Sequence, residues 1–184
     1  MKRFWQLLIL SWVALMISTA HADVIGGINF PRNLDGFELR SVIDNEKSNP
    51  GLGVTLLYNA PGVKVSVFVY DHSQSNIPEG IDSSIIHNEF AEARGNVRQA
   101  YPDAQILVRE ARFLVAGIPI LQSAFQYTEM RPGSRDTVLS HLYLTARKGN
   151  FVKVRITYPA TDQPELGRRI QIQFIEALCE VLAK

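Results

Sequence analysis

Residues 63–70 read Val-Lys-Val-Ser-Val-Phe-Val-Tyr, and this stretch decides the class of fold. Valine occupies every second position, and valine is one of the residues most enriched in β-strands. Because successive side chains of a strand point to opposite faces, the four valines share one face. The stretch therefore predicts a β-strand with one face turned toward a hydrophobic core.

A turn signal precedes this strand. Ala60-Pro61-Gly62 separates it from residues 54–58, which also form a strand candidate. Because Pro and Gly supply the backbone angles of tight turns, the two strands are expected to pair as an antiparallel hairpin. Before the hairpin, residues 37–44 form another short strand candidate. Residues 23–35, which are interrupted by Gly and Pro, are expected to be an irregular arm.

The periodicity of the sequence indicates two helices. In the first, apolar residues recur at spacings of three and four, Asp82 or Ser83 is the N-cap, and Pro102 stops the helix. The second is C-terminal, with Asp162 as its cap and Pro164 in its first turn. The expected apolar faces consist of Ile86, Phe90, Ala93, Val97 and Ala100 in the first helix, and Ile170, Phe174, Leu178 and Val181 in the second.

Four further strand candidates lie between the two helices, at residues 105–115, 119–129, 137–146 and 151–158. The links between them are short, and a parallel connection would need a dozen residues or more. Antiparallel pairing is therefore expected. The order of strands, helix, strands and helix predicts an α+β fold, with one antiparallel sheet of about six or seven strands and two main helices.

The last two strands predict a more detailed arrangement. Each has one apolar face, and a slip of one residue would turn every side chain to the other face. Matching the two apolar faces requires a loop with an odd number of residues. The three residues 148–150 meet this condition, with a glycine available for a positive φ. The expected register places Tyr143 opposite Arg155 and His141 opposite Thr157.

The order of the elements resembles that of a known family. The run Asn49-Pro50-Gly51-Leu52-Gly53-Val54, the strand end Val69-Tyr70-Asp71 and the closing hairpin plus helix look like the PsbP-like α/β/α sandwich group. The resemblance covers most of the chain after residue 22. It implies a central antiparallel sheet with helices packed on it. It also implies a binding or assembly role, and it carries over no functional residue.

The first 22 residues have the three parts of a cleavable signal peptide. Two basic residues precede the apolar stretch 4–16, and Ala20-His21-Ala22 is an A-x-A cleavage site. The alternative is an uncleaved membrane anchor, which needs about twenty apolar residues, more than this segment supplies. The sequence predicts cleavage after Ala22 and a periplasmic or secreted protein, in which residues 23–184 form a single α+β domain.

Charge and motifs exclude several classes of function. The chain has 19 basic and 18 acidic residues, and removal of Lys2 and Arg3 brings its net charge to −1. This balance is not that of a nucleic-acid-binding or membrane-surface protein, so neither partner is expected. The short motifs of nucleotide, zinc-protease and α/β-hydrolase sites are absent, and no cofactor or metal is expected. Cys179 is the single cysteine and is expected to be a buried thiol.

The main candidate site is the polar sheet face that the expected register builds. An arginine over an aromatic ring is favourable by about 0.5–1 kcal/mol at an exposed site. Such a face fits an anionic group or a partner protein, and the alternative is an ordinary solvated sheet face. Its residues are Tyr143, Arg155, Lys153 and His141, joined by Gln122 and Gln126 if residues 119–129 pair next to this hairpin.

Two other segments carry residues with useful chemistry. Asp71-His72-Ser73 contains the residue types of acid–base and nucleophilic catalysis, but neighbours in sequence do not face one another as a triad requires, and a turn is expected. The segment 130–136 carries Arg131 and Arg135 on an expected hairpin loop. These two arginines are suited to a carboxylate or a phosphate, and a solvated loop is the alternative.

The sequence thus predicts a binding or assembly module that holds a protein partner or a small ligand at the sheet face or its loops. The alternative is an exported enzyme, hydrolase-like in its chemistry. Such an enzyme would need a pocket that pairs a histidine with Asp or Glu. A third possibility is a purely structural component of the cell envelope.

Overall fold

The structure is a computed structural model of the 184-residue chain, and it describes residues 23–160 and 164–184. The predicted signal peptide and the predicted Asp162 cap lie outside these residues. The strands are β1 (Asp23–Ile25), β2 (Ile28–Phe30), β3 (Asn33–Leu34), β4 (Phe37–Asp44), β5 (Val54–Ala60), β6 (Val63–Tyr70), β7 (Gln105–Val115), β8 (Ile118–Arg131), β9 (Ser134–Arg147) and β10 (Asn150–Pro159), and the helices are α1 (Ser84–Ala100) and α2 (Pro164–Leu182).

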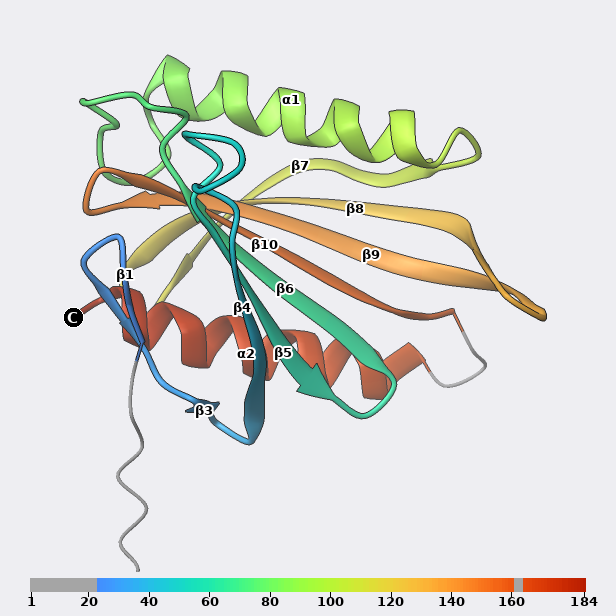
Figure 1. Ribbon diagram of the computed structural model, residues 1–184. Coiled ribbons are helices and arrows are strands. Elements are labelled where there is room, and N and C mark those ends of the chain that lie inside the picture. The colour runs from blue at the N-terminus through green and yellow to red at the C-terminus, as the bar shows by residue number, and fades with distance from the viewer. Residues whose placement is uncertain (1–22, 161–163) are drawn as a thin grey trace, which may run out of the picture.

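The molecule is layered as helix, sheet and helix (Figure 1). Its main sheet is antiparallel, with the strand order β3-β4-β5-β6-β10-β9-β8-β7. Helix α1 packs on one face of this sheet and α2 on the other, each over its own hydrophobic cluster. The predicted α+β class with two helices is confirmed. The main sheet has eight strands where about six or seven were expected, and β1 and β2 form a separate two-stranded ribbon.

β5 and β6 form the predicted hairpin, and it lies near the middle of the sheet. Val54 pairs with Val69 and Ala60 with Val63, so Pro61-Gly62 forms the turn. The four valines of β6 are buried on the face covered by α2. Tyr70 is buried on the opposite face, which α1 covers. Both faces of β6 are therefore part of a core.

Helix α1 forms where the period of apolar residues changes. Ser83 is its N-cap, and the Ser83 hydroxyl accepts the backbone N–H of Ile86 at 3.4 Å. The helix ends before Pro102, which cannot continue it. Ile86, Phe90, Ala93 and Val97 form the buried stripe as predicted, whereas Ala100 is exposed.

Helix α2 packs its aromatic and aliphatic stripe on the other face of the sheet. Phe174 meets the rings of Phe37 and Tyr58 edge to face, with centroids 5.0 and 5.4 Å away. Cys179 is buried as predicted, and burial raises the pKa of its thiol to about 12. Within the described ranges, neither α1 nor α2 combines the length and the apolar character needed to span a membrane.

The segment expected to be an irregular arm is ordered into short strands, so that prediction is wrong. β1 pairs with β2, and β3 pairs with the start of β4. Ile28 and Phe30 alternate with exposed Asn29 and are buried in the cluster under α2. The alternation is only three residues long, which is too short to be recognised as a strand in the sequence.

The turn between β9 and β10 is shorter than predicted. β9 ends at Arg147 and β10 begins at Asn150, so two residues connect them instead of three. Lys148 has φ 49° and Gly149 has φ 73°. Positive φ at both central residues defines the type I′ turn, which matches the twist of paired strands. The three-residue loop is therefore replaced by a tight hairpin.

This turn shifts the predicted register by one residue. Arg155 lies opposite Leu142 rather than Tyr143, and the predicted pairing of His141 with Thr157 is wrong by the same shift. The expected register required each strand to have a single apolar face. Because a helix covers each face of the sheet, β9 is apolar on both faces, with Leu139 under α2 and Leu142 and Leu144 under α1, so matching one apolar face does not determine the register.

The loop between β4 and β5 is held by a single carboxylate. Glu46 accepts the backbone N–H groups of Gly51 and Gly53, each at 2.9 Å. Gly53 has φ 55°, and a Cβ at this position would overlap the carbonyl oxygen of Val69 on β6. The carbonyl of Gly51 accepts the N–H of His72 at 2.9 Å. The run 49–54 therefore rests directly on the end of β6.

Strand β7 forms one edge of the main sheet, and most of it is exposed. Its pairing with β8 is interrupted twice, between Ile106 and Val108 and between Val108 and Ala111. Each interruption is a change of register of the kind that a β-bulge produces. The second interruption consists of Arg109 and Glu110.

Candidate functional site

A pocket of about 530 Å³ lies between α2 and the half of the sheet that ends in β7. One wall is the side of α2 on which buried Gln171 and Ile175 adjoin exposed Ile172, and the other is formed by β7 to β10. The apolar lining residues are Val108, Phe113, Val115, Ile120, Ile172 and Ile175, and the polar ones are Gln122, His141, Tyr143, Tyr158, Arg168, Gln171 and Glu176.

Five polar side chains close a hydrogen-bonded ring in the wall of this pocket. The Gln122 amide donates to His141 Nδ1 (3.0 Å) and to the Tyr143 hydroxyl (3.2 Å). His141 Nε2 lies 3.0 Å from the hydroxyl of Tyr158, which donates to the Gln171 carbonyl at 3.3 Å. The Gln171 amide returns to the hydroxyl of Tyr143. We call these five residues the polar ring.

The proton count of the polar ring leaves three groups unused within it. Since His141 Nδ1 accepts, its Nε2 carries the proton and donates to Tyr158. The hydroxyl oxygen of Tyr143 accepts two amide N–H groups, and its own proton has no acceptor within the ring. Gln171 uses one of its two amide N–H groups in the ring. The carbonyl oxygen of Gln122 has no hydrogen-bond partner among the described residues. The ring therefore leaves two donors and one acceptor for a bound molecule.

The polar ring is uncharged at neutral pH. Burial lowers the pKa of His141 to about 4, so its imidazole is neutral. Burial also raises the pKa of Tyr143 and of Tyr158 above the ordinary tyrosine value. The charged side chains of the pocket, Arg168 and Glu176, are exposed at its rim. Such a site suits an uncharged polar group on an apolar body, because a buried charge would lack a partner.

The sheet face that was predicted as a site is divided between the two faces. Gln122, His141 and Tyr143 lie together under α2, as expected for neighbouring strands. Lys153 and Arg155 lie under α1, because the two-residue turn places them on the opposite face. The predicted residue Gln126 lies opposite Leu139, on the α2 face but outside the polar ring.

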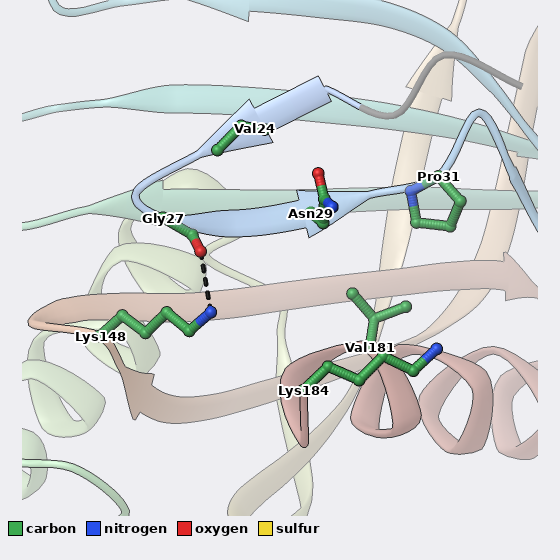
Figure 2. A pocket seen from close by; sticks show the side chains of 7 residues that line it. All are labelled: Val24, Gly27, Asn29, Pro31, Lys148, Val181 and Lys184. Atoms are coloured by element: carbon green, nitrogen blue, oxygen red, sulfur yellow. Dashed lines mark hydrogen bonds between the residues drawn. The ribbon is translucent and has the colours of Figure 1, made fainter.

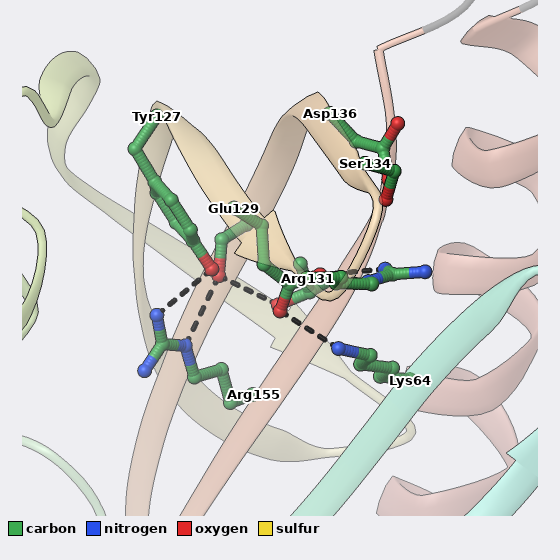
Figure 3. Close-up of polar contacts among 9 residues, drawn as sticks. Lys64, Tyr127, Glu129, Arg131, Ser134, Asp136 and Arg155 are labelled. Atoms are coloured by element: carbon green, nitrogen blue, oxygen red, sulfur yellow. Dashed lines mark hydrogen bonds and ion pairs between the residues drawn. The ribbon is translucent and has the colours of Figure 1, made fainter.

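Arg155 does lie over aromatic rings, but not over the predicted Tyr143. Its guanidinium is 5.2 Å from the ring centre of Tyr101 and 5.7 Å from that of Tyr127. It also donates to the hydroxyl of Tyr127 at 3.0 Å (Figure 3) and to Ser140 at 3.1 Å. These contacts give Arg155 a structural role under α1.

Lys153 is half-buried between the rings of Tyr70 and Phe68. Its ammonium is 4.7 and 5.1 Å from their ring centres. Burial lowers the pKa of Lys153, although the carboxylates of Glu89 and Glu92 oppose the shift. Within the described part of the chain, no carboxylate lies within 4.0 Å of this ammonium.

The two arginines of the segment 130–136 do not form the expected loop. β8 and β9 continue to a two-residue turn, so Arg131 and Arg135 belong to paired strands. Arg131 and Lys64 converge on the carboxylate of Glu129 (Figure 3), with Lys64 Nζ at 2.7 Å. Arg135 lines a separate hollow of about 420 Å³ beside Asp103. The structure therefore does not bring Arg131 and Arg135 together at one site.

Asp71-His72-Ser73 forms a turn, as expected. The Asp71 carboxylate accepts the N–H of Ser73 at 2.7 Å, and His72 and Ser73 have φ of 52° and 57°. His72 Nε2 lies 3.0 Å from the carboxylate of Glu89, which also accepts the hydroxyl of Tyr70. The pairing of His72 with Glu89 was not predicted, because Glu89 lies on the buried stripe of α1, where a carboxylate is unusual.

A smaller pocket lies beside the N-terminal ribbon (Figure 2). Its volume is about 390 Å³, and Val24, Asn29 and Lys184 are among its lining residues. Lys148 donates from its ammonium to the carbonyl of Gly27 at 2.9 Å. The lysine thus fastens the ribbon to the turn between β9 and β10.

Sequence reasoning missed Tyr158 and Gln171 as members of the polar ring. Tyr158 belongs to the apolar face of its strand, where an aromatic residue indicates only packing in the core. Gln171 lies on the buried stripe of α2, one turn before Phe174. A glutamine in an apolar stripe was a usable signal, since a buried amide needs hydrogen-bond partners.

Comparison with known proteins gives a likeness of fold only. The crystal structure of PA94, a protein of unknown function from Pseudomonas aeruginosa, is 12% identical, with a TM-score of 0.45, and the match covers 81% of this chain and 87% of that one. The crystal structure of the Ran-binding protein Mog1p from Saccharomyces cerevisiae is 13% identical, with a TM-score of 0.40, over 86% and 88%. No family model matches the chain, and no curated protein matches it significantly.

Proposed function

We propose that this protein is an exported binding module whose pocket between the sheet and α2 holds a small ligand. The polar ring is the observation that carries this proposal. Five neutral side chains, four of them buried, converge on one cavity and leave two donors and one acceptor unused. A cavity of a few hundred cubic ångströms with an apolar lining and a few convergent polar groups is the usual form of a small-molecule site.

The ligand has an apolar body and an uncharged hydroxyl, carbonyl or amide group. Val108, Phe113 and Ile172 supply apolar contacts at the pocket walls. The free proton of Tyr143 and the free oxygen of Gln122 supply the polar contacts. A charged head group is disfavoured at the polar ring, because the described side chains there are neutral at pH 7.

The test uses 1-naphthol as a probe, since it combines an apolar body with one hydroxyl group. Phe113 is 47% exposed and lines the pocket, whereas Leu114 is 73% exposed and follows it on the opposite face of β7. Phe113→Ala should weaken 1-naphthol binding by about tenfold, the loss expected for one large apolar contact. The matched variant Leu114→Ala should bind like the wild type.

A second variant tests the polar contact. Tyr143→Phe removes the hydroxyl and should weaken binding of 1-naphthol relative to naphthalene, which has no hydroxyl. Both ligands are titrated by following the fluorescence of their own naphthalene ring, because residues 23–184 contain no tryptophan, and thermal unfolding checks that each variant is folded. Equal affinity for 1-naphthol in the wild type, Phe113→Ala and Tyr143→Phe would remove this pocket from consideration.

Export is part of the proposal and has its own measurement. The predicted cleavage site after Ala22 implies a mature chain that begins at Asp23. Full-length protein expressed in a Gram-negative host should yield a periplasmic form with this N-terminus, as read by intact mass. A full-length chain that remains in the membrane fraction would contradict the cleavable signal and support an uncleaved anchor.

The resemblance to the PsbP-like sandwich group remains a proposal as well, and it extends the binding role to a protein partner. The layering of helix, sheet and helix supports it. Crosslinking in cells, followed by purification of the tagged mature protein, is the corresponding experiment. Recovery of one stoichiometric partner supports a binding module, and recovery of the protein alone favours the small ligand.

A hydrolase-like enzyme is the second candidate, because the structure contains a histidine paired with a carboxylate. His72 Nε2 lies 3.0 Å from Glu89, and both residues lie near the strained turn at the end of β6. Backbone strain of this kind accumulates at functional sites. A panel of ester, amide and phosphoester substrates should then show turnover that His72→Ala abolishes. Turnover that survives in His72→Ala would exclude this pair as its source.

A further inference from the structure

Another hollow lies on the face of the sheet that α1 covers, between α1 and β7. Its volume is about 270 Å³, and three of its six lining residues are arginines. Two arginines come from α1 and one from the bulged segment of β7, so side chains distant in sequence meet here. The lining residues are Ala91, Arg94, Gly95, Arg98, Ile106 and Arg109.

The three arginines lack acidic partners. Among the described residues, no carboxylate lies within 4.0 Å of Arg94, Arg98 or Arg109, whereas Arg112, also on β7, lies 3.8 Å from Asp82. The carboxylate of Glu110, next to Arg109, is directed to His87 at 3.9 Å. The positive charge around the hollow is therefore not neutralised by the protein, although both signs are balanced over the whole chain.

Arg94 is held in place and still has donors to spare. One terminal nitrogen donates to the backbone carbonyl of Arg109 at 2.8 Å, which joins α1 to β7. Its guanidinium lies 5.2 Å from the ring centre of Phe90. The Nε of Arg94 is buried and has no hydrogen-bond partner in the described ranges. A buried donor without a partner is costly, and an anion in the hollow would satisfy guanidinium donors.

Gly95 shapes the hollow. It stands in the interior of α1, where glycine is less favourable than alanine. No packing reason explains this, because a Cβ added at Gly95 would meet no atom within 4 Å. The missing side chain leaves open space on the helix surface between the two arginines of α1. The absence of a side chain at Gly95 therefore contributes to the open space of the hollow.

We propose that this hollow binds a phosphate-class oxyanion, either inorganic phosphate or the phosphomonoester end of a small molecule. Three guanidinium groups match an anion with several acceptor oxygens, since each presents paired donors to phosphate oxygens. The site is independent of the polar ring, which lies on the opposite face of the sheet. It gives the protein a second ligand of different chemistry.

The experiment is isothermal titration calorimetry of the mature protein with inorganic phosphate, at constant ionic strength set by sodium chloride. A second arm uses glycerol 3-phosphate. Arg98→Gln and Arg109→Gln should each weaken binding by about tenfold or more, the effect of losing one charge-assisted contact. Arg112→Gln is the matched control from the same strand and should stay within about twofold of the wild type. Tighter binding of glycerol 3-phosphate indicates the ester, and equal binding indicates the free anion.

The variant Gly95→Ala distinguishes a loss of phosphate binding from a loss of fold stability. The variant should keep or raise the melting temperature, because alanine is the better helix former, while it weakens phosphate binding by filling the hollow. No binding of either anion to the wild type would overturn the proposal. An equal loss in Arg112→Gln and Arg109→Gln would do the same, since it would show a diffuse charge effect rather than a site.

Discussion

The Nε2 of His141 lies 3.0 Å from the phenolic oxygen of Tyr158, and the two rings stack with centroids 5.6 Å apart. Because Nδ1 of the same imidazole accepts from Gln122 at 3.0 Å, a second proton would point at an amide that is itself a donor. The hydrogen bonds and the burial of His141 therefore act in the same direction. Both hold the imidazole neutral.

His141 should make the protein less stable in mild acid. Burial lowers its pKa from 6.5 to about 4. Between these values the unfolded chain takes up a proton that the folded chain does not, so the free energy of unfolding falls as the pH falls. We expect this group alone to remove about 2 kcal/mol between pH 7 and pH 5, as measured by urea unfolding at both values.

The variant His141→Gln is the control for that prediction. It cannot titrate, so its free energy of unfolding should change less between pH 7 and pH 5 than that of the wild type. A loss in the variant as large as in the wild type would assign the acid sensitivity to another group.

The polar ring should behave as one cooperative unit. Tyr143→Phe removes the acceptor of two amide N–H groups and should destabilise the fold by about 1–3 kcal/mol. Gln171→Leu should cost a similar amount, because it leaves the hydroxyl of Tyr158 without its acceptor. The double variant should cost clearly less than the sum of the two, as measured by chemical unfolding. Additive losses would show that the two contacts are independent.

Gly53 should be intolerant of any side chain. Gly53→Ala combines a positive φ of 55° with overlap of the new Cβ and the carbonyl of Val69. We expect a loss of about 3 kcal/mol or more in the free energy of unfolding. Gly62→Ala is the matched variant, with φ 70° and no atom within 4 Å, and it should lose only about 1–2 kcal/mol. Similar losses in both would show that the contact with Val69 is easily relieved.

Arg155→Glu should destabilise the fold, because Arg155 has structural contacts and does not belong to an exposed binding surface. The substitution removes the contacts with Tyr127 and Ser140 and places a carboxylate among half-buried rings. We expect a loss of about 2–4 kcal/mol by thermal unfolding. Arg155→Lys keeps the charge and should lose less. A folded Arg155→Glu variant with wild-type stability would return Arg155 to the list of surface residues.

The fold follows from the sequence wherever period and turn chemistry agree. The alternating valines of β6 form a buried face as predicted, and Ser83, one of the two predicted caps, begins α1. Four of the five predicted stripe residues of α1 are buried. Pro61-Gly62 likewise determines its hairpin. In these segments local preference and burial favour the same conformation.

The candidate site was predicted only in part, because its register depends on tertiary context. Gln122, His141 and Tyr143 were placed together correctly, since alternation groups His141 with Tyr143 and the predicted pairing of the neighbouring strand adds Gln122. Arg155 was assigned to the wrong face, because a one-residue change in the turn reverses every later side chain. Gln171 comes from α2, and no local pattern says which strand a helix residue will meet.

The two bulges of β7 determine how the sheet ends. A regular edge strand presents its N–H and C=O groups in step, so that a strand from another molecule can extend the ladder. In β7 this regular spacing is interrupted twice within six residues, and Arg109 and Glu110 form the second interruption. An incoming strand in register with one end of β7 would be out of register with the other. The bulged edge is therefore a poor template for the addition of a strand from another molecule, although it carries exposed apolar side chains.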